Sequence, residues 1–143
     1  MKDENGGLGD LYDRIGFLIR RAHQKAGAMF HDITDGITTS QYGALYILKT
    51  KGSMDHNNLA KYLHVDKTNV SVIVKSLEKY GFVSRTLSKK DKRQKILELT
   101  PSGDQAYAAI EAKARAAHDH LMSKFTDEEV KQFRIFLRRL VDD

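Results

Sequence analysis

The sequence predicts a mainly α-helical fold of the α+β class, in which helices precede and follow a single β-hairpin. Apolar residues recur at steps of three and four along most of the 143 residues, which is the spacing of amphipathic helices. Two short segments, 82–87 and 95–100, instead have the composition of strands and flank a polar connection. A chain of this length is expected to form one domain around one core.

Two helices are expected in the first third of the chain. The first is a long amphipathic helix over residues 11–33, and Gly36 marks the break that follows it. Thr38 is followed three residues later by Gln41, which matches a capping box. This motif predicts that a second helix begins after Thr38 and ends near Gly52.

Two further helices are expected before the hairpin. Asp55 is the expected N-cap of a short helix, and Asp66 is the expected N-cap of a fourth helix that ends at Gly81. The short helix should turn three apolar residues inward, namely Leu59, Ala60 and Leu63. The fourth helix has an apolar stripe formed by Val70, Ile73, Val74, Leu77 and Tyr80. Its opposite face carries short or cationic residues, namely Thr68, Ser71, Val72, Lys75 and Lys79.

Two helices are expected after the hairpin. Thr100 caps the first of them, and Pro101 occupies its first helical position, where the missing N–H costs nothing. This helix is expected to run through residues 102–125. Thr126 and Glu129 form a second capping box, which predicts the start of the last helix. The apolar residues of the last helix repeat at helical spacing and are Val130, Phe133, Leu137, Leu140 and Val141.

The composition excludes several classes of site. The chain has no cysteine, which excludes disulfides, thiolate metal ligands and a cysteine nucleophile. Its six histidines lack a metal-ligand spacing, and no glycine-rich phosphate loop, nucleophile elbow or placed carboxylate pair is present. The sequence therefore predicts no catalytic residue, no metal site and no cofactor, and an enzyme is not expected.

The sequence also lacks the features of a membrane or exported protein. The first ten residues contain no apolar stretch of the kind found in a signal peptide. No window approaches the roughly 18 uninterrupted apolar residues that span a bilayer. A cytoplasmic protein without a membrane partner is expected.

The positive charge of the chain is concentrated in one region. The formal net charge is +5, and residues 65–100 contain nine Lys and Arg against four Asp and Glu. The other residues contain 15 basic and 15 acidic side chains, so they carry no net charge. A localised anion-binding surface requires this kind of distribution.

Two short helices, the fourth helix with its short and cationic face, and the basic hairpin together match the pattern of a winged helix-turn-helix, which binds double-stranded DNA. The major groove admits one helix, and short polar side chains and lysines reach its base edges and phosphates. An exposed valine at position 72 is useful there because it can contact a thymine methyl group. The residues expected to meet bases or nearby phosphates are Lys67, Thr68, Asn69, Ser71, Val72 and Lys75. The alternative for this helix alone is a solvated face without a partner.

The hairpin is expected to act as the basic wing of this motif. Lys92 and Arg93 lie near its tip and could enter a minor groove, where the negative potential is enhanced. The phosphate contacts are expected from Lys89, Lys90 and Lys95, with Arg85 on the preceding strand. Asp91 is expected to pair with Arg93 or Arg85 and hold the tip rigid, although a surface ion pair of little energetic weight is the alternative.

Residues 65–103, "VDKTNVSVIVKSLEKYGFVSRTLSKKDKRQKILELTPSG", resemble the signature of the MarR family of bacterial transcription regulators. The motif residues match in order and spacing and are Leu77, Glu78, Gly81, Arg85, Asp91, Arg93, Leu99, Thr100 and Gly103. The common wing has two arginines after the aspartate, whereas this chain has Lys92 at the first position. Lysine keeps the charge but lacks the bidentate fork of arginine.

The resemblance implies one MarR-type domain over residues 1–143, in which segments 8–35 and 102–143 dimerise and segment 37–100 forms the winged helix-turn-helix lobe. It further implies a homodimer whose two recognition helices read a pseudo-palindromic operator. The apolar stripes at the two ends of the chain favour burial in a two-fold partner. An intramolecular helix bundle is the alternative.

The resemblance also implies a small-molecule effector. Segments 17–24, "FLIRRAHQ", and 38–45, "TTSQYGAL", are similar to the branch that controls aromatic-acid catabolism, where aromatic acids or their coenzyme A thioesters relieve repression. Arg20, Arg21 and His23 could meet a carboxylate or phosphate. The residues that could line an aromatic slot are Phe17, Phe30, Tyr42 and Tyr46. The alternative is that the cations are solvated and the aromatic residues belong to the core.

These observations predict a homodimeric, sequence-specific transcriptional repressor that a small aromatic acid or its thioester releases from DNA. The alternative is a non-specific, nucleoid-type DNA-binding protein without a ligand.

Overall fold

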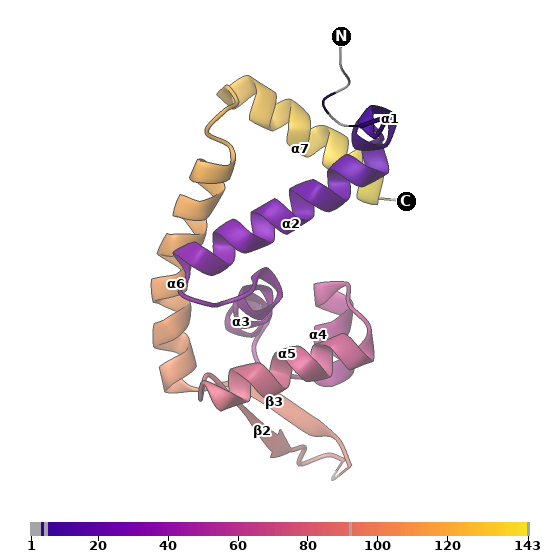
Figure 1. Cartoon of the computed structure of the whole chain (residues 1–143). Coiled ribbons are helices and arrows are strands. Elements are labelled where there is room, and N and C mark those ends of the chain that lie inside the picture. The colour runs from indigo at the N-terminus through magenta and orange to yellow at the C-terminus, as the bar shows by residue number, and fades with distance from the viewer. Residues whose placement is uncertain (1–3, 5, 92, 143) are drawn as a thin grey trace.

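The computed structural model describes residues 4, 6–91 and 93–142 and confirms a mainly helical fold with a small antiparallel sheet (Figure 1). The elements before the wing are α1 (Gly9–Tyr12), α2 (Ile15–Ile33), α3 (Thr39–Lys51), β1 (Met54–Asp55), α4 (His56–Leu63) and α5 (Lys67–Lys79). The elements after them are β2 (Val83–Leu87), β3 (Lys95–Leu99), α6 (Pro101–Leu121) and α7 (Asp127–Val141).

The molecule has a lobe at one end and a pair of helical segments at the other. The lobe consists of α3, α4, α5 and the sheet, and the β2–β3 hairpin projects from it (Figure 1). We call this hairpin, including the connection 88–94, the wing. Helix α6 leads from the wing along the side of the lobe, and α7 lies with α1 at the end far from the wing (Figure 1).

The caps confirm the helix starts that the sequence predicts. The Thr38 hydroxyl accepts a hydrogen bond from the Gln41 N–H at 3.0 Å, and Gln41 Oε1 accepts one from the Thr38 N–H at 3.0 Å. Thr126 and Glu129 form the same reciprocal pair at 3.1 and 2.9 Å. Such boxes satisfy two N–H groups that a helix end otherwise leaves without partners.

The first predicted helix is not continuous, so the expectation of one helix over residues 11–33 is wrong. Arg14 has an extended backbone and is the N-cap of α2. This break in the helical backbone separates α2 from the short α1. The Tyr12 ring stacks on Phe17 with 5.5 Å between centroids, which holds α1 against the first turn of α2. Helix α6 likewise ends earlier than expected, at Leu121, because residues 122–125 form a turn.

The core of the lobe lies where α3, α4, α5 and β3 meet. Its fully buried side chains are Leu45, Leu59, Leu77, Leu97, Val70 and Val74. Four of the five predicted stripe residues of α5 are buried, but Tyr80 is 50% exposed. Tyr80 is the C-cap of α5, where the chain leaves the helix, and its ring stacks on Phe82 with 5.3 Å between centroids.

Strand β1 was not indicated by the sequence. It pairs antiparallel with β3, with Met54 opposite Leu97 and Asp55 opposite Ile96, so the sheet order is β1-β3-β2. A strand of two residues is too short to show an alternating pattern. Its pairing brings the N-terminus of α4 to the base of the wing.

The two ends of the chain expose a large set of apolar side chains. Ten of them, which we call the apolar terminal face, are Leu8, Leu11, Ile15, Leu18, Ile19, Phe133, Phe136, Leu137, Leu140 and Val141. Helix α7 has no buried residue within the described part of the chain. Within the same part, no helix is long and apolar enough to cross a membrane.

Gly103 at the junction of β3 and α6 has no room for a side chain. A Cβ atom there would lie 2.1 Å from the Phe82 carbonyl oxygen and 2.9 Å from Leu99 Cδ1. Gly103→Ala should therefore lower the free energy of unfolding by about 1–3 kcal/mol, measured by urea denaturation. Gly27→Ala is the matched control, because nothing lies within 4 Å of that position in α2. It should raise stability by about 0.5–1 kcal/mol. Equal effects of the two substitutions would contradict the steric explanation.

Candidate nucleic-acid interface

Helix α5 presents a short, mostly polar face to solvent because its opposite face is buried. Thr68, Asn69, Val72 and Lys75 are exposed and Ser71 is half-buried. Val72 is 61% exposed, which is unusual for a valine without a partner. The buried stripe of α5 thus fixes the direction of the α5 side chains that the sequence predicts to contact DNA.

Two of these side chains already have local hydrogen bonds. The Ser71 hydroxyl donates to the Lys67 carbonyl oxygen at 3.0 Å. The Asn69 side-chain amide donates to Asp66 Oδ2 at 3.4 Å, and Asp66 Oδ1 caps the helix through the Asn69 N–H at 2.7 Å. Among the described residues, Thr68 and Lys75 form no such local side-chain hydrogen bond, and Val72 has no polar group to form one.

The wing carries its cations in solvent and is closed by hydrogen bonds to its own backbone. Lys89, Lys90, Arg93 and Lys95 are all exposed, whereas Lys92 lies outside the described residues. The Ser88 N–H donates to the carbonyl oxygen of Gln94 at 2.8 Å. The Ser88 hydroxyl accepts from the backbone N–H groups of Lys90 and Asp91 at 3.2 and 3.4 Å. These hydrogen bonds therefore join the described residues on the two sides of the charged tip.

Asp91 orders this tip through the backbone. Its Oδ1 accepts a hydrogen bond from the Arg93 N–H at 3.0 Å. The sequence predicted a side-chain pair between Asp91 and either Arg93 or Arg85, and the contact to Arg93 involves the backbone instead. The Arg93 guanidinium consequently keeps its donors available for an external anion, as judged over the described residues.

Arg85 pairs with Glu78 and not with Asp91, which corrects the second alternative of that prediction. Arg85 Nε lies 2.6 Å from Glu78 Oε1, and the two side chains are 29% and 30% exposed. The approach is off the line of the N–H bond, so the contact is an ion pair more than an aligned hydrogen bond. It joins β2 of the wing to the last turns of α5.

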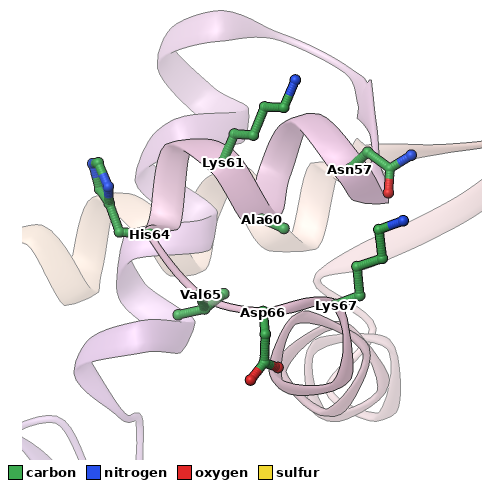
Figure 2. Close-up of a pocket in the computed structure, with 7 residues that line it drawn as sticks. All are labelled: Asn57, Ala60, Lys61, His64, Val65, Asp66 and Lys67. Carbon is green, nitrogen blue, oxygen red and sulfur yellow. The ribbon is translucent and has the colours of Figure 1, made fainter.

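A groove beside the N-terminus of α5 adds residues that the sequence pattern did not indicate (Figure 2). It encloses about 670 Å³ between α4 and α5, and its lining residues are Asn57, Ala60, Lys61, His64, Val65, Asp66 and Lys67. Asn57 and Lys67 extend to the same side of the groove, while the Asp66 carboxylate turns away from α4 (Figure 2). The helical spacing of the polar residues 57, 61 and 64 along α4 could have indicated this surface, but it is also typical of a solvated helix face.

His56, the first residue of α4, lies among the charged groups at the base of the wing. Burial lowers the pKa of His56 below its usual value of 6.5, and the positive charges of Arg85 and Lys95 lower it further. Glu78 and Asp55 act in the opposite direction. The net effect keeps the imidazole neutral near pH 7.

Part of the predicted ligand set forms an aromatic cluster between α2, α3 and α6. The Tyr42 ring lies 5.5 Å from Phe30, 6.1 Å from Tyr46 and 6.2 Å from Tyr107, measured between centroids. The Tyr42 hydroxyl donates a hydrogen bond to Glu111. Burial raises the pKa of Tyr42, and this hydrogen bond lowers the pKa of Glu111. Tyr107 and Glu111, both on α6, are additional to the predicted ligand set.

The other four residues of the predicted ligand set lie elsewhere on α2. Phe17, Arg20, Arg21 and His23 occupy its N-terminal half, and the 13 positions from Phe17 to Phe30 span about 20 Å of helix. The Arg20 guanidinium lies over the Phe17 ring, 4.8 Å from its centroid. A single chain therefore does not bring all seven predicted residues together.

The arrangement of α4, α5 and the wing defines the class of the protein. A short helix, a tight turn and a second helix with one buried and one exposed face form a helix-turn-helix, and the adjoining basic hairpin makes it a winged one. Proteins of this class bind DNA.

Known proteins identify the family. The MarR family model matches residues 37–95. The HTH-type transcriptional regulator YwoH of Bacillus subtilis is 33% identical over 108 residues, which cover 73% of this chain and 78% of YwoH. A regulatory protein assigned to the hcr operon of Thauera aromatica is 29% identical over 135 residues, covering 92% of this chain and 81% of that protein. A transcriptional regulator from Pseudomonas aeruginosa has a solved structure with a TM-score of 0.87 and 30% identity, covering 92% and 99% of the two chains.

The chain belongs to the MarR family of transcriptional regulators. These relatives are DNA-binding regulators and not enzymes.

The lowered pKa of His56 makes stability depend on pH. Unfolding releases the imidazole to its usual pKa of 6.5, so the unfolded chain binds more protons than the folded chain between the two pKa values. The free energy of unfolding should therefore be highest above pH 6.5 and fall as the pH is lowered through 6.5. His56→Gln should flatten this part of the profile, measured by urea denaturation at pH 7.5, 6.5 and 5.5. A variant with the same slope as the native chain would assign the dependence to other groups.

Proposed function

We propose that this protein is a homodimeric, sequence-specific repressor that binds a pseudo-palindromic operator and leaves it when a small aromatic acid or its coenzyme A thioester binds. The observation that carries the proposal is the exposed face of α5, with Thr68, Val72 and Lys75, next to a wing in which four exposed cations have no ion-pair partner in the described residues. These cations are Lys89, Lys90, Arg93 and Lys95. The proposal also assigns residues 37–100 to DNA binding and residues 8–35 and 102–143 to dimerisation.

In the proposed complex α5 lies in the major groove and the wing reaches the flanking minor groove. Lys75 and Thr68 are then near base edges, and Val72 is near a thymine methyl group. Lys67 and the groove residues Asn57 and Lys61 are placed to hold backbone phosphates, which fix register and carry no sequence information. A solved structure of the repressor CouR bound to a 23-mer DNA duplex has this fold, with a TM-score of 0.83 and 23% identity.

The apolar terminal face supports the homodimer. Ten large apolar side chains exposed on two terminal segments form more apolar surface than a monomer ordinarily leaves in water. A second copy of the chain, related by a two-fold axis, presents the same apolar terminal face, so the dimer buries this face on both chains. In such a dimer the two copies of α5 would be about 34 Å apart, which is one turn of the duplex.

The proposed effector class rests on relatives and on the chemistry of α2 and α3. The solved structure of Bordetella bronchiseptica BpsR, with a TM-score of 0.84 and 21% identity, concerns regulation of DNA binding by 6-hydroxynicotinic acid. The aromatic cluster around Tyr42 suits a planar ring, and Arg20, Arg21 and His23 suit a carboxylate or phosphate. The two groups of residues are separated along α2, so an elongated thioester fits them better than a compact free acid.

The test of this function is selection of bound duplexes from genomic DNA. A regulator should prefer its selected duplex over random duplex by a factor on the order of 10³ or more, whereas a nucleoid-type protein should show little preference. Titration of aromatic acids and their thioesters against the selected complex then tests the effector. The effector proposal fails if none of these compounds changes the affinity.

The wing and α5 should make separable contributions to binding. Arg93→Ala should weaken binding to every duplex and reduce the slope of log affinity against log salt by about one, since one phosphate contact is lost. Thr68→Ala or Lys75→Ala should instead reduce the discrimination between bases at one position of the duplex. The expected loss in this difference of binding free energy is about 1–3 kcal/mol. Fluorescence anisotropy on the selected duplex and its single-base variants measures both. An unchanged salt slope for Arg93→Ala would place that side chain outside the interface.

Helix α7 should be necessary for the dimer. Leu137→Glu places a charge in the apolar terminal face and should convert the protein to a monomer with lower operator affinity, because the two half-sites are no longer linked. Gln132→Glu on the same helix makes the same change in charge at an exposed polar position and is the matched control. Analytical ultracentrifugation gives the oligomeric state. A dimeric Leu137→Glu variant would show that the interface lies elsewhere.

A further inference from the structure

One carboxylate at the start of α4 has two roles. Asp55 Oδ1 accepts a hydrogen bond from the Asn58 N–H at 2.8 Å and thereby caps α4. Asp55 Oδ2 accepts a second hydrogen bond from the side-chain amide of Gln94 in the wing. These two residues are 39 positions apart in the chain, and the pairing of β1 with β3 brings them together.

Gln94 closes the turn that carries the wing cations. Its backbone N–H donates to the Asp91 carbonyl oxygen at 3.0 Å, and its carbonyl oxygen accepts from the Ser88 N–H at 2.8 Å. Arg93 is the residue directly before it, and the Arg93 N–H is held by Asp91 Oδ1. The backbone position of Arg93 is therefore linked to α4 through Gln94 and Asp55.

The wing is tied to the lobe on both of its strands. On β2, Arg85 forms the ion pair with Glu78 of α5 at 2.6 Å. Directly before β3, Gln94 is held by Asp55, the last residue of β1 and the N-cap of α4. A hairpin held on one strand can still turn about that strand, whereas a hairpin held on both has a defined angle to the helices.

We propose that Asp55 and Gln94 are positioning residues that fix the angle of the wing relative to α5 and so determine where Arg93 meets DNA. The proposal rests on the proposed DNA-binding function, because it concerns the use of the wing in that complex. In the proposed complex, Gln94 acts through Arg93 and does not itself contact DNA.

The physical reason is preorganisation. The minor groove is only about 6 Å wide, so a wing side chain enters it from a narrow range of angles. A wing that is already held at this angle loses less conformational freedom on binding, which raises affinity without a new contact. The amide of Gln94 is neutral, so its replacement by Leu leaves the net charge and the long-range attraction to DNA unchanged.

The first test needs no DNA and uses the absence of native cysteine. A nitroxide attached to Lys90→Cys at the wing tip reports local mobility by electron paramagnetic resonance. Gln94→Leu should make the label more mobile, because the contact to Asp55 is lost. Gln105→Leu, an exposed position on α6, makes the same chemical change outside the wing and should leave the spectrum unchanged. Equal spectra for Gln94→Leu and the parent would overturn the proposal.

The second test is a double-mutant cycle on the duplex selected by the native protein. Gln94→Leu should weaken binding by roughly three- to tenfold, the equivalent of one hydrogen bond. In the Arg93→Ala background the same substitution should have little further effect, since its action runs through Arg93. Additive losses would indicate a general structural role and would overturn the proposal.

The two tests separate this inference from the function on which it rests. If the native protein selects no preferred duplex, the proposed operator function fails, while the spin-label result still decides whether Asp55 and Gln94 hold the wing. If the native protein does select a duplex and Gln94→Leu binds it as well as the parent, the operator function stands and the positioning role is refuted.

Discussion

The burial of one face of α5 is the constraint on which the rest of the structure depends. Val70, Val74 and Leu77 are almost completely removed from water and pack in the core that Leu59 of α4 and Leu97 of β3 complete. Burying each such side chain contributes about 1.5–3 kcal/mol. Rotation of α5 would expose this stripe, so the opposite face must point outward with Thr68, Val72 and Lys75. The same contacts that stabilise the lobe therefore determine which side chains α5 exposes to solvent.

The wing depends on polar contacts more than on this core. Leu97 of β3 is fully buried, but the projecting part of the hairpin is held by Glu78, Asp55 and the hydrogen bonds of its own tip. Individual contacts of this kind contribute about 0.5–1.5 kcal/mol. The wing is therefore held by weaker interactions than α5, and changes in a few polar residues can alter its position without unfolding the lobe.

Polar side-chain contacts also join α6 to α3 and to the segment before α3. Lys49 of α3 pairs with Asp104 at 2.5 Å, and Asp35, before α3, pairs with Lys113 at 3.1 Å. Tyr42 binds Glu111 between them on α6, in the aromatic cluster. Both surface pairs are largely exposed and contribute little individually. The orientation of the lobe on α6 therefore depends more on packing, which includes Ile110 and Ala117 of α6 and the cluster around Tyr42. That cluster is also the part of the predicted ligand set that the fold brings together.

The sequence by itself determined the features that arise within a few residues. Capping boxes at Thr38 and Thr126, the proline at the start of α6 and the apolar period of α5 could all be predicted, because caps and helix faces depend on neighbours within about one turn. The solvent-exposed residues of α5 followed from the same period. Only the tertiary structure decided which distant side chains meet. Glu78 pairs with Arg85 and leaves Asp91 to the backbone, Asp55 reaches Gln94, and Tyr42 reaches Glu111 over 69 positions. Periodicity cannot indicate such partners, since it specifies the face of an element but not the element that this face will meet.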